Sequence, residues 1–164
     1  MANSQMTPGS TFQYILSNQM PSAVAWVRGG TAHPAISGLV KFYQTPYQGI
    51  LVEAEIFNLP GVNQQGSTGF FAMHIHQNGN CANNFANVGP HMGAPGSMHP
   101  FHSGDLIPLL ANQGYAWTAF YDKRFTIRDI LGRSVIIHMN PDDFRTQPSG
   151  NSGSMIACGE IRTS

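Results

Sequence analysis

The chain has 164 residues, enough for one domain with a substantial core, and its 8 Lys and Arg residues balance its 8 Asp and Glu residues. Because phosphate binding needs a basic face, this balance argues against a nucleic-acid partner, and it gives no sign of an electrostatic membrane anchor. No run approaches the roughly 20 apolar residues of a spanning helix. The N-terminus also lacks the basic start and apolar stretch of a secretory signal.

Residues 1–22 are polar and lack a clean hydrophobic period, so we expect an N-terminal extension, partly ordered through Phe12, Tyr14, Ile15 and Leu16. A domain spanning residues 23–164 follows. Short apolar or alternating runs in it predict about eight strands and no convincing amphipathic helix. The predicted strands are residues 22–30, 37–45, 49–61, 70–77, 114–121, 125–130, 132–140 and 155–162. This pattern predicts an all-β antiparallel sandwich with Greek-key connections.

Residues 77–106 interrupt the strand pattern with thirty positions rich in Gly, Pro, Asn and His. An irregular segment of this length in a compact domain is usually functional or is held in place by a ligand. A metal could hold it, because metal-binding free energy then becomes folding free energy.

Six of the seven histidines are candidate metal ligands. His74 and His76 are two positions apart in a predicted strand, so both rings point to the same face, although such a pair alone is weak evidence. The other candidates are His91, His99 and His102 in the long loop, together with Asp105, and His138 at the end of a strand. Histidines with one carboxylate suit zinc, and an all-histidine site suits copper or zinc. The alternative is a set of unrelated surface and core histidines, as we expect for His33 in a turn.

Cys81 and Cys158 are the two cysteines, and neither belongs to a Cys-x-x-Cys pair. Spacing alone leaves open whether they are buried thiols or a disulfide. A disulfide would contribute roughly 4–5 kcal/mol by the loop-entropy model and would indicate an oxidising compartment.

Five segments carry a resemblance to a known family: HIHQNGNC, VGPH, HSGDL, VIIHMNPDD and GNSGSMIACGEI, in this order. They resemble the copper–zinc superoxide dismutase family over about residues 23–162. The short step of five from His76 to Cys81 resembles the bacterial branch more than the animal one. The resemblance implies an eight-stranded antiparallel Greek-key β-sandwich or flattened barrel with long metal-binding loops.

The resemblance also implies copper and zinc as cofactors, superoxide as substrate and a possible homodimer. By motif position, the copper ligands are His74, His76, His91 and His138, and the zinc ligands are His91, His99, His102 and Asp105. His91, which bridges the metals, and His138 are the implied catalytic residues. Asp142 matches the carboxylate that links a copper ligand to a zinc ligand, and Cys81 and Cys158 match the family disulfide.

Two features depart from the family. Met155 stands where the family has an arginine that attracts the anion, so we expect reduced activity. Arg145 in the nearby loop is a candidate substitute, although a solvated loop arginine is the simpler interpretation. The step of three residues from His99 to His102 is shorter than usual, which makes the zinc geometry less certain than that of copper.

Three functions therefore stay open at the level of sequence. The first is a superoxide dismutase with a reduced rate. The second is a copper- or zinc-binding protein of the same fold with a buffering or delivery role. The third is a structural protein that uses a metal to hold its loop. The implied disulfide favours an extracellular, cell-surface or periplasm-like compartment.

Overall fold

A computed structural model describes residues 7–62, 64 and 66–164, so the first six residues of the predicted extension lie outside it. These described residues contain nine strands, two short helices and one 3-10 turn, which confirms the all-β class. The strands are β1 (Ala23–Gly29), β2 (Ser37–Gln44), β3 (Ile50–Phe57), β4 (Phe70–Phe71), β5 (Met73–His76), β6 (Leu109–Leu110), β7 (Ala116–Asp122), β8 (Ser134–His138) and β9 (Met155–Thr163). The helical elements are α1 (Pro8–Asn18), η1 (Asn83–Phe85) and α2 (Ile127–Ile130).

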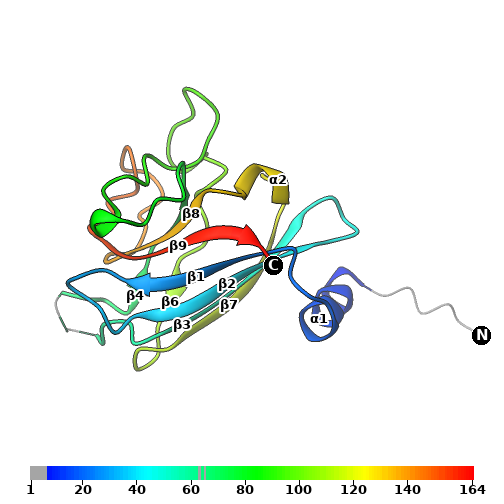
Figure 1. The fold of residues 1–164 in the computed structure, drawn as a ribbon, viewed down its shortest axis with the longest axis horizontal. Helices are drawn as coiled ribbons and strands as arrows, with labels where there is room; N and C mark the ends of the chain where they lie inside the picture. The colour runs from blue at the N-terminus through cyan, green and yellow to red at the C-terminus, as the bar shows by residue number, and fades with distance from the viewer. Residues whose placement is uncertain (1–6, 63, 65) are drawn as a thin grey trace, which may run out of the picture.

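Seven strands form one curled antiparallel sheet, half of a flattened barrel, in the order β5-β8-β9-β1-β2-β3-β7. The first and last strands pair with each other, and β3 pairs with β7 across a long connection. Strands β4 and β6 make a separate two-stranded sheet. Figure 1 shows β1, β2, β3 and β7 side by side, with the long green and orange loops gathered beyond β8 and β9. The end of the sheet beyond β8 and β9, where the long loops gather, is therefore the end at which these loops can form a site.

Alternation along β3 shows how the sequence sets the two faces of the sheet. Val52, Ala54 and Ile56 are fully buried in the main core, whereas Glu53 and Glu55 on the opposite face are half-buried. Side chains alternate between faces with a period of two, so this strand matches the prediction.

Helix α1 corrects the expectation that the chain has no amphipathic helix. Thr7 caps its N-terminus by accepting a hydrogen bond from the backbone of Ser10, and Pro8 occupies the first turn, where its missing N–H costs nothing. Ile15 is buried against Tyr43 and Leu51 on the outer face of the sheet. With so few apolar residues the helix is hard to recognise from its own sequence, because its stability comes from packing on the sheet.

Residues 125–130 were predicted as a strand, and the structure shows that this prediction is wrong. The carboxylate of Asp129 accepts hydrogen bonds from the backbone N–H and the hydroxyl of Thr126, at 2.8 and 2.7 Å, as in a capping box, and the chain turns into α2. Elsewhere the predicted strand 70–77 is divided into β4 and β5, and the two-residue strand β6 was not predicted. None of the described helices is long and apolar enough to cross a membrane.

Candidate metal centre

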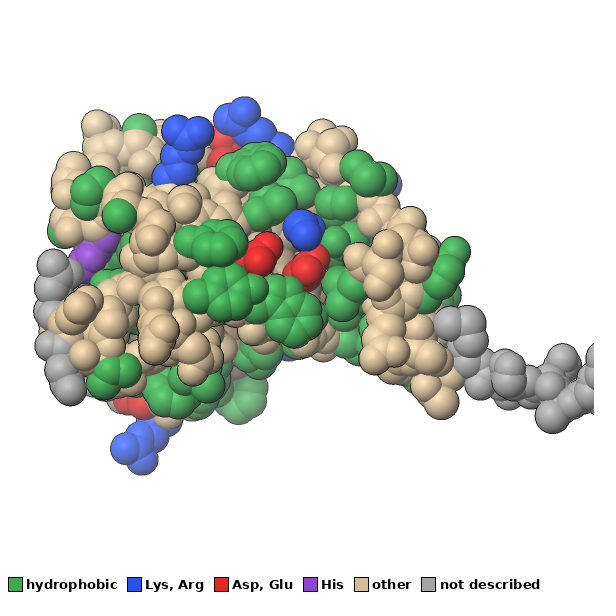
Figure 2. Space-filling model, turned by 90° about the horizontal axis from the view of Figure 1, so that it is seen from below, with side chains coloured by type: hydrophobic (Ala, Val, Ile, Leu, Met, Phe, Trp, Pro, Cys, Tyr) green, Lys and Arg blue, Asp and Glu red, His purple; other side chains and the backbone are tan. Residues whose placement is uncertain are grey.

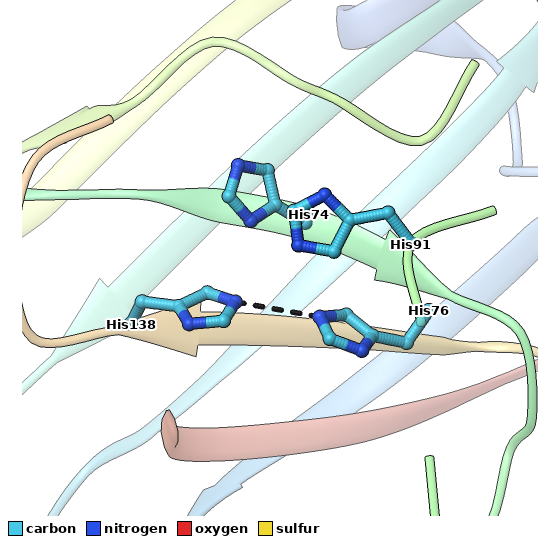
Figure 3. A group of neighbouring side chains, drawn as sticks. All are labelled: His74, His76, His91 and His138. Atoms are coloured by element: carbon cyan, nitrogen blue, oxygen red, sulfur yellow. Dashed lines mark hydrogen bonds between the residues drawn. The ribbon is translucent and has the colours of Figure 1, made fainter. Parts of the chain in front are cut away.

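Four histidine rings meet at the loop-bearing end of the sheet (Figure 3). One ring nitrogen from each lies within 4.8 Å of the others, and all four residues are buried. We call this group the strand cluster, and its members are His74, His76, His91 and His138. The structure thus brings together the four residues predicted as copper ligands.

Strand β5 positions His74 and His76, and its free edge also positions the loop. The backbones of His91 and Asp105 form β-bridges with His76 and His74, respectively. The N–H of Ile75 donates to the carbonyl of Gly104 at 2.9 Å, and the carbonyl of Ile75 accepts from Met92 at 2.8 Å. These bonds satisfy an otherwise open sheet edge and fix two loop segments against the histidine pair.

A β-bulge positions His138. The pairing between β8 and β9 shifts between Ile137 and His138, so that Ile137 faces Ala157 and His138 faces Met155. A bulge turns the following side chain away from the regular alternation. The ring of His138 thereby joins the two rings from β5, as Figure 3 shows.

A second group, which we call the loop cluster, surrounds one carboxylate. Its members are His91, His99, His102 and Asp105, whose ligand atoms also lie within 4.8 Å of one another. The Nδ1 atoms of His91, His102 and His99 lie 2.7, 3.0 and 3.2 Å from the oxygens of Asp105. The short His99–His102 step therefore still brings both rings to the predicted zinc position, and His91 belongs to both clusters.

Asp142 connects the two clusters. Its Oδ2 accepts a hydrogen bond from Nε2 of His74, and its Oδ1 accepts one from Nε2 of His99, each at 2.8 Å. Because a carboxylate only accepts, the hydrogen of both rings sits on Nε2 and the lone pair sits on Nδ1. Those Nδ1 atoms are buried and have no hydrogen-bond partner, and each faces its own cluster.

The remaining rings of the strand cluster show the same arrangement. Nδ1 of His76 donates to the carbonyl of Gly89 at 2.7 Å, and Nδ1 of His138 lies 3.3 Å from the carbonyl of Gly153. The Nε2 atoms of the two rings lie 3.4 Å apart, the contact marked by the dashed line in Figure 3, and Nε2 of His76 directs its lone pair into the cluster because its hydrogen is on Nδ1. Nε2 of His91 is buried without a partner as well. Converging lone pairs repel unless a cation lies between them, so the donor set fits a metal ion.

The pKa values favour the ligand forms of these side chains. Burial lowers the pKa of His76 to about 4 and that of His138 well below its usual value. Burial raises the pKa of Asp105, but the hydrogen bond and charge of His91 and its neighbours outweigh burial and lower this pKa to about 2. At neutral pH the rings of His76 and His138 are thus neutral and the carboxylate of Asp105 is ionised, as metal binding requires.

Two residues outside the histidine motifs, Arg124 and Gln147, hold the loop cluster by its backbone. Arg124, anchored on Asp122, donates to the carbonyl of Asp105 at 2.6 Å and to that of His102 at 3.3 Å. The side-chain amide of Gln147 donates to the carbonyl of His99 at 2.6 Å and accepts from its N–H at 3.0 Å. Both bind backbone atoms, which carry no residue signature, so no motif could reveal them.

Gly150 packs against the connection made by Asp142. Its φ of +67° lies in the left-handed region, and a Cβ there would collide with Oδ1 of Asp142 and lie 2.6 Å from Nε2 of His99. The absence of a side chain at this position is therefore a condition for the bridge between the clusters.

A cavity of about 320 Å³ opens onto the strand cluster. Its lining residues are His76, Pro90, His91, His102, His138, Pro148, Ser149, Gly153, Ser154 and Met155. The lining contains no Lys or Arg, and Met155 forms part of it. Arg145 is exposed and lies outside the lining, so the structure does not support it as a substitute.

A disulfide joins Cys81 to Cys158, with the two Cα atoms 5.8 Å apart. It attaches the segment after β5 to β9, and it confirms the disulfide that the family resemblance implied. His33 lies half-exposed in a turn and belongs to neither cluster, as expected.

Comparison with protein families decides the relationship. The family model of copper/zinc superoxide dismutase (SODC) matches residues 36–161. The chain belongs to this family. Copper and zinc are the metals that name the family, and the two clusters fit them.

Relatives in the family include enzymes and a chaperone. The chain is 31% identical over 159 residues to superoxide dismutase [Cu-Zn] of Caulobacter vibrioides, covering 86% of each chain. It is 32% identical over 140 residues to extracellular superoxide dismutase [Cu-Zn] of Rattus norvegicus, covering 80% of this chain. It is 31% identical over 142 residues to the copper chaperone for superoxide dismutase of Homo sapiens, covering 79% of this chain. The chain spans 57% of the rat protein and 49% of the human one.

Solved structures share the fold. A SOD-like protein from Bacillus subtilis, in a double-mutant form, superposes with a TM-score of 0.71 at 25% identity, covering 83% of this chain and 94% of its own. The clock protein EA4 superposes with a TM-score of 0.73 at 25% identity, covering 88% and 96%. The fold is thus shared by a SOD-like protein and by a clock protein.

Proposed function

We propose that this chain is a superoxide dismutase that holds copper at the strand cluster and zinc at the loop cluster. The observation that carries the proposal is the cavity of about 320 Å³ beside three rings of the strand cluster. A purely structural metal site is closed, whereas a catalytic site keeps a position open to a small molecule. Without the cavity, the two clusters would suit a structural metal site as well as a catalytic one.

Copper would supply the one-electron exchange by which one superoxide is oxidised to dioxygen and a second is reduced to hydrogen peroxide. The residues of the chain orient the ligand rings and transfer protons. Asp105 holds the ring of His91 through Nδ1 at 2.7 Å, which leaves its Nε2 without a protein partner. That atom carries a lone pair, so His91 can take up a proton from water there and pass it to peroxide in the cavity, and His138 holds the opposite side of the cluster.

Charge in the cavity sets the expected rate. Superoxide is an anion, and a charge-assisted contact with an arginine would contribute roughly 1.5–3 kcal/mol to its binding. Met155 offers no such contact, and the cavity lining contains no Lys or Arg. We therefore expect turnover below that of an enzyme with an arginine at this position, and weak dependence on ionic strength.

The test is superoxide removal measured by stopped flow on protein loaded with one copper and one zinc. A copper-dependent rate far above spontaneous dismutation, lost in His138→Ala, would support the enzyme. Metal analysis of both proteins separates loss of copper from loss of chemistry. A fully loaded wild-type protein with no rate above that of His138→Ala would refute it.

A second candidate function is copper buffering or delivery, and Met155 is the observation that favours it. A thioether is a soft donor that suits Cu(I), and this one lines the cavity with the strand cluster. The similarity to a copper chaperone is consistent with such a role. Transfer of Cu(I) to a metal-free acceptor protein, faster than release to buffer, would support delivery, and equal rates would exclude it.

A further inference from the structure

The outer face of β1, β2, β3 and β7 carries a group of exposed aromatic side chains, separate from both metal clusters. Figure 2 shows acidic and basic side chains enclosed by hydrophobic ones on one face of the molecule. Trp26 is 68% exposed and Trp117 is 52% exposed, and Phe57 and Tyr115 are exposed beside them. Helix α1 covers only the neighbouring part of this face, through Ile15. We call the uncovered part the aromatic face.

The rings of the aromatic face are held in fixed orientations by two carboxylates. Nε1 of Trp117 donates to Oε1 of Glu53 at 3.1 Å, and Oη of Tyr115 donates to Oε1 of Glu55 at 3.0 Å. The ring centroids of Phe57 and Tyr115 are 5.3 Å apart. Aromatic side chains immobilised in this way lose little further conformational entropy when they bind a partner.

The two carboxylates differ in how their charge is balanced. Glu53 forms an ion pair with Lys41 at 3.1 Å and accepts a second hydrogen bond from Tyr43 at 3.0 Å. Glu55 accepts from Tyr115 alone, and within the described residues no Lys or Arg forms an ion pair with it. Within the described residues, Glu55 is therefore a carboxylate of the aromatic face without an ion-pair partner.

Neighbouring side chains enclose Glu55 on several sides. The sheet register places Leu39 and Trp117 directly beside it, one on each adjacent strand. Phe57 lies two residues along the same face, and a groove of about 690 Å³ runs from Glu55 and Phe57 to Trp26. Arg28 lines the same groove from β1 but makes no ion pair with Glu55 within the described residues.

We propose that the aromatic face is a docking site for an arginine side chain of a partner protein. Charge complementarity selects a cation, because Glu55 is the carboxylate of this face that forms no ion pair within the described residues. Exposed indole and phenol faces attract cations within about 6 Å, and arginine does so more often than lysine. A guanidinium group can also donate two hydrogen bonds to one carboxylate while its plane stacks on a ring. The groove beside Trp26 accommodates the neighbouring residues of the partner segment.

The probe is a short Gly/Ser peptide carrying two arginines, titrated into the full chain and followed by calorimetry and tryptophan fluorescence. Its matched control replaces both arginines by citrulline, which keeps the shape and removes the charge. We expect saturable binding of the arginine peptide and at least about tenfold weaker binding of the citrulline peptide. Equal affinities for the two peptides would overturn the proposal.

Protein variants localise the binding. Glu55→Gln is expected to weaken binding of the arginine peptide about tenfold. The control is Glu160→Gln, which removes a carboxylate on β9 that is already paired with Arg162 at 2.6 Å and should leave binding unchanged. Equal losses in the two variants would indicate non-specific attraction and overturn the proposal. So would a dimer of the free protein, seen by sedimentation, that Glu55→Gln or Trp117→Ser dissociates, because a second copy would then be the occupant.

Glu55→Gln should leave superoxide removal unchanged, since Glu55 belongs to neither metal cluster. The peptide and superoxide experiments therefore succeed or fail independently of each other.

Discussion

The strand cluster and the loop cluster share His91 but differ in what holds them. His74, His76 and His138 project from β5 and β8, whose backbones are paired within the seven-stranded sheet. The rings of the loop cluster come instead from the irregular segment before Asp105, which is fixed by bonds to the edge of β5 and by Arg124 and Gln147.

The fold itself therefore positions most ligands of the strand cluster. The geometry of the loop cluster depends on hydrogen bonds from Arg124 and Gln147 and on its metal. A site on paired strands keeps its geometry when empty, because sheet hydrogen bonds and a core position the ligands. A loop site shares its metal-binding free energy with the ordering of the loop. Four changes test this contrast.

Removing the disulfide disconnects the loop region from β9. The Cys81→Ser and Cys158→Ser double variant should lower the free energy of unfolding of the metal-free protein by about 4 kcal/mol, since the bridge spans 77 residues. Urea denaturation measures this quantity, and wild-type protein under reducing conditions should show the same loss. A difference below about 1 kcal/mol would mean that the loop is held by its hydrogen bonds alone.

Removing a ligand that belongs only to the loop cluster should separate the two sites. If four ligands share the roughly 10–16 kcal/mol of a structural zinc site, His102→Ala loses about 3 kcal/mol, or more than a hundredfold in zinc affinity. Copper affinity at the strand cluster should change little. Chelator competition measures both affinities, with His33→Ala as the matched control. An equal loss of copper would contradict the contrast between the clusters.

Changing the bridge should affect both clusters together. Asp142→Asn replaces one accepting oxygen by an NH₂ group, which faces the N–H of His74 or His99 and cannot accept from it. Affinity for both metals should fall about 10–100-fold. The neighbouring change Asp143→Asn serves as the control, because that side chain bonds only within its own turn. A loss confined to one metal would show that Asp142 supports only that cluster.

Adding charge to the cavity should sharpen the function of the strand cluster without touching its ligands. Met155→Arg should raise the rate of superoxide removal about tenfold at low salt, because it supplies a cation beside the site. The gain should shrink as salt is added. Met155→Leu keeps the apolar wall and should leave the rate unchanged. A rise in Met155→Leu equal to that in Met155→Arg would point to cavity shape in place of charge.

The sequence predicted the parts of this protein whose signals are local. Alternation revealed strands such as β3, and the order of the histidine motifs indicated which rings come together. The sequence did not predict α1, because its apolar residues acquire a partner only when Tyr43 and Leu51 present the outer face of the sheet. Nor did it separate α2 from a strand, because the capping box of Thr126 and Asp129 overrides the short apolar pattern.

The candidate site shows the same limit. Residues that point a functional group at the clusters, such as His102 and Asp142, could be predicted from motif position. Arg124 and Gln147 could not, since they act on backbone carbonyls and amides of residues that are distant in sequence. Only the folded chain shows which backbone atoms need support.

Gly150 makes this protein unexpectedly vulnerable to inherited change. It belongs to neither metal cluster and does not line the cavity beside the strand cluster, yet any larger residue there would displace the carboxylate that serves both clusters. A single nucleotide substitution at its codon could therefore inactivate both centres while every ligand in the gene stayed intact. Genetic screens that score variants by ligand retention would classify such an allele as harmless.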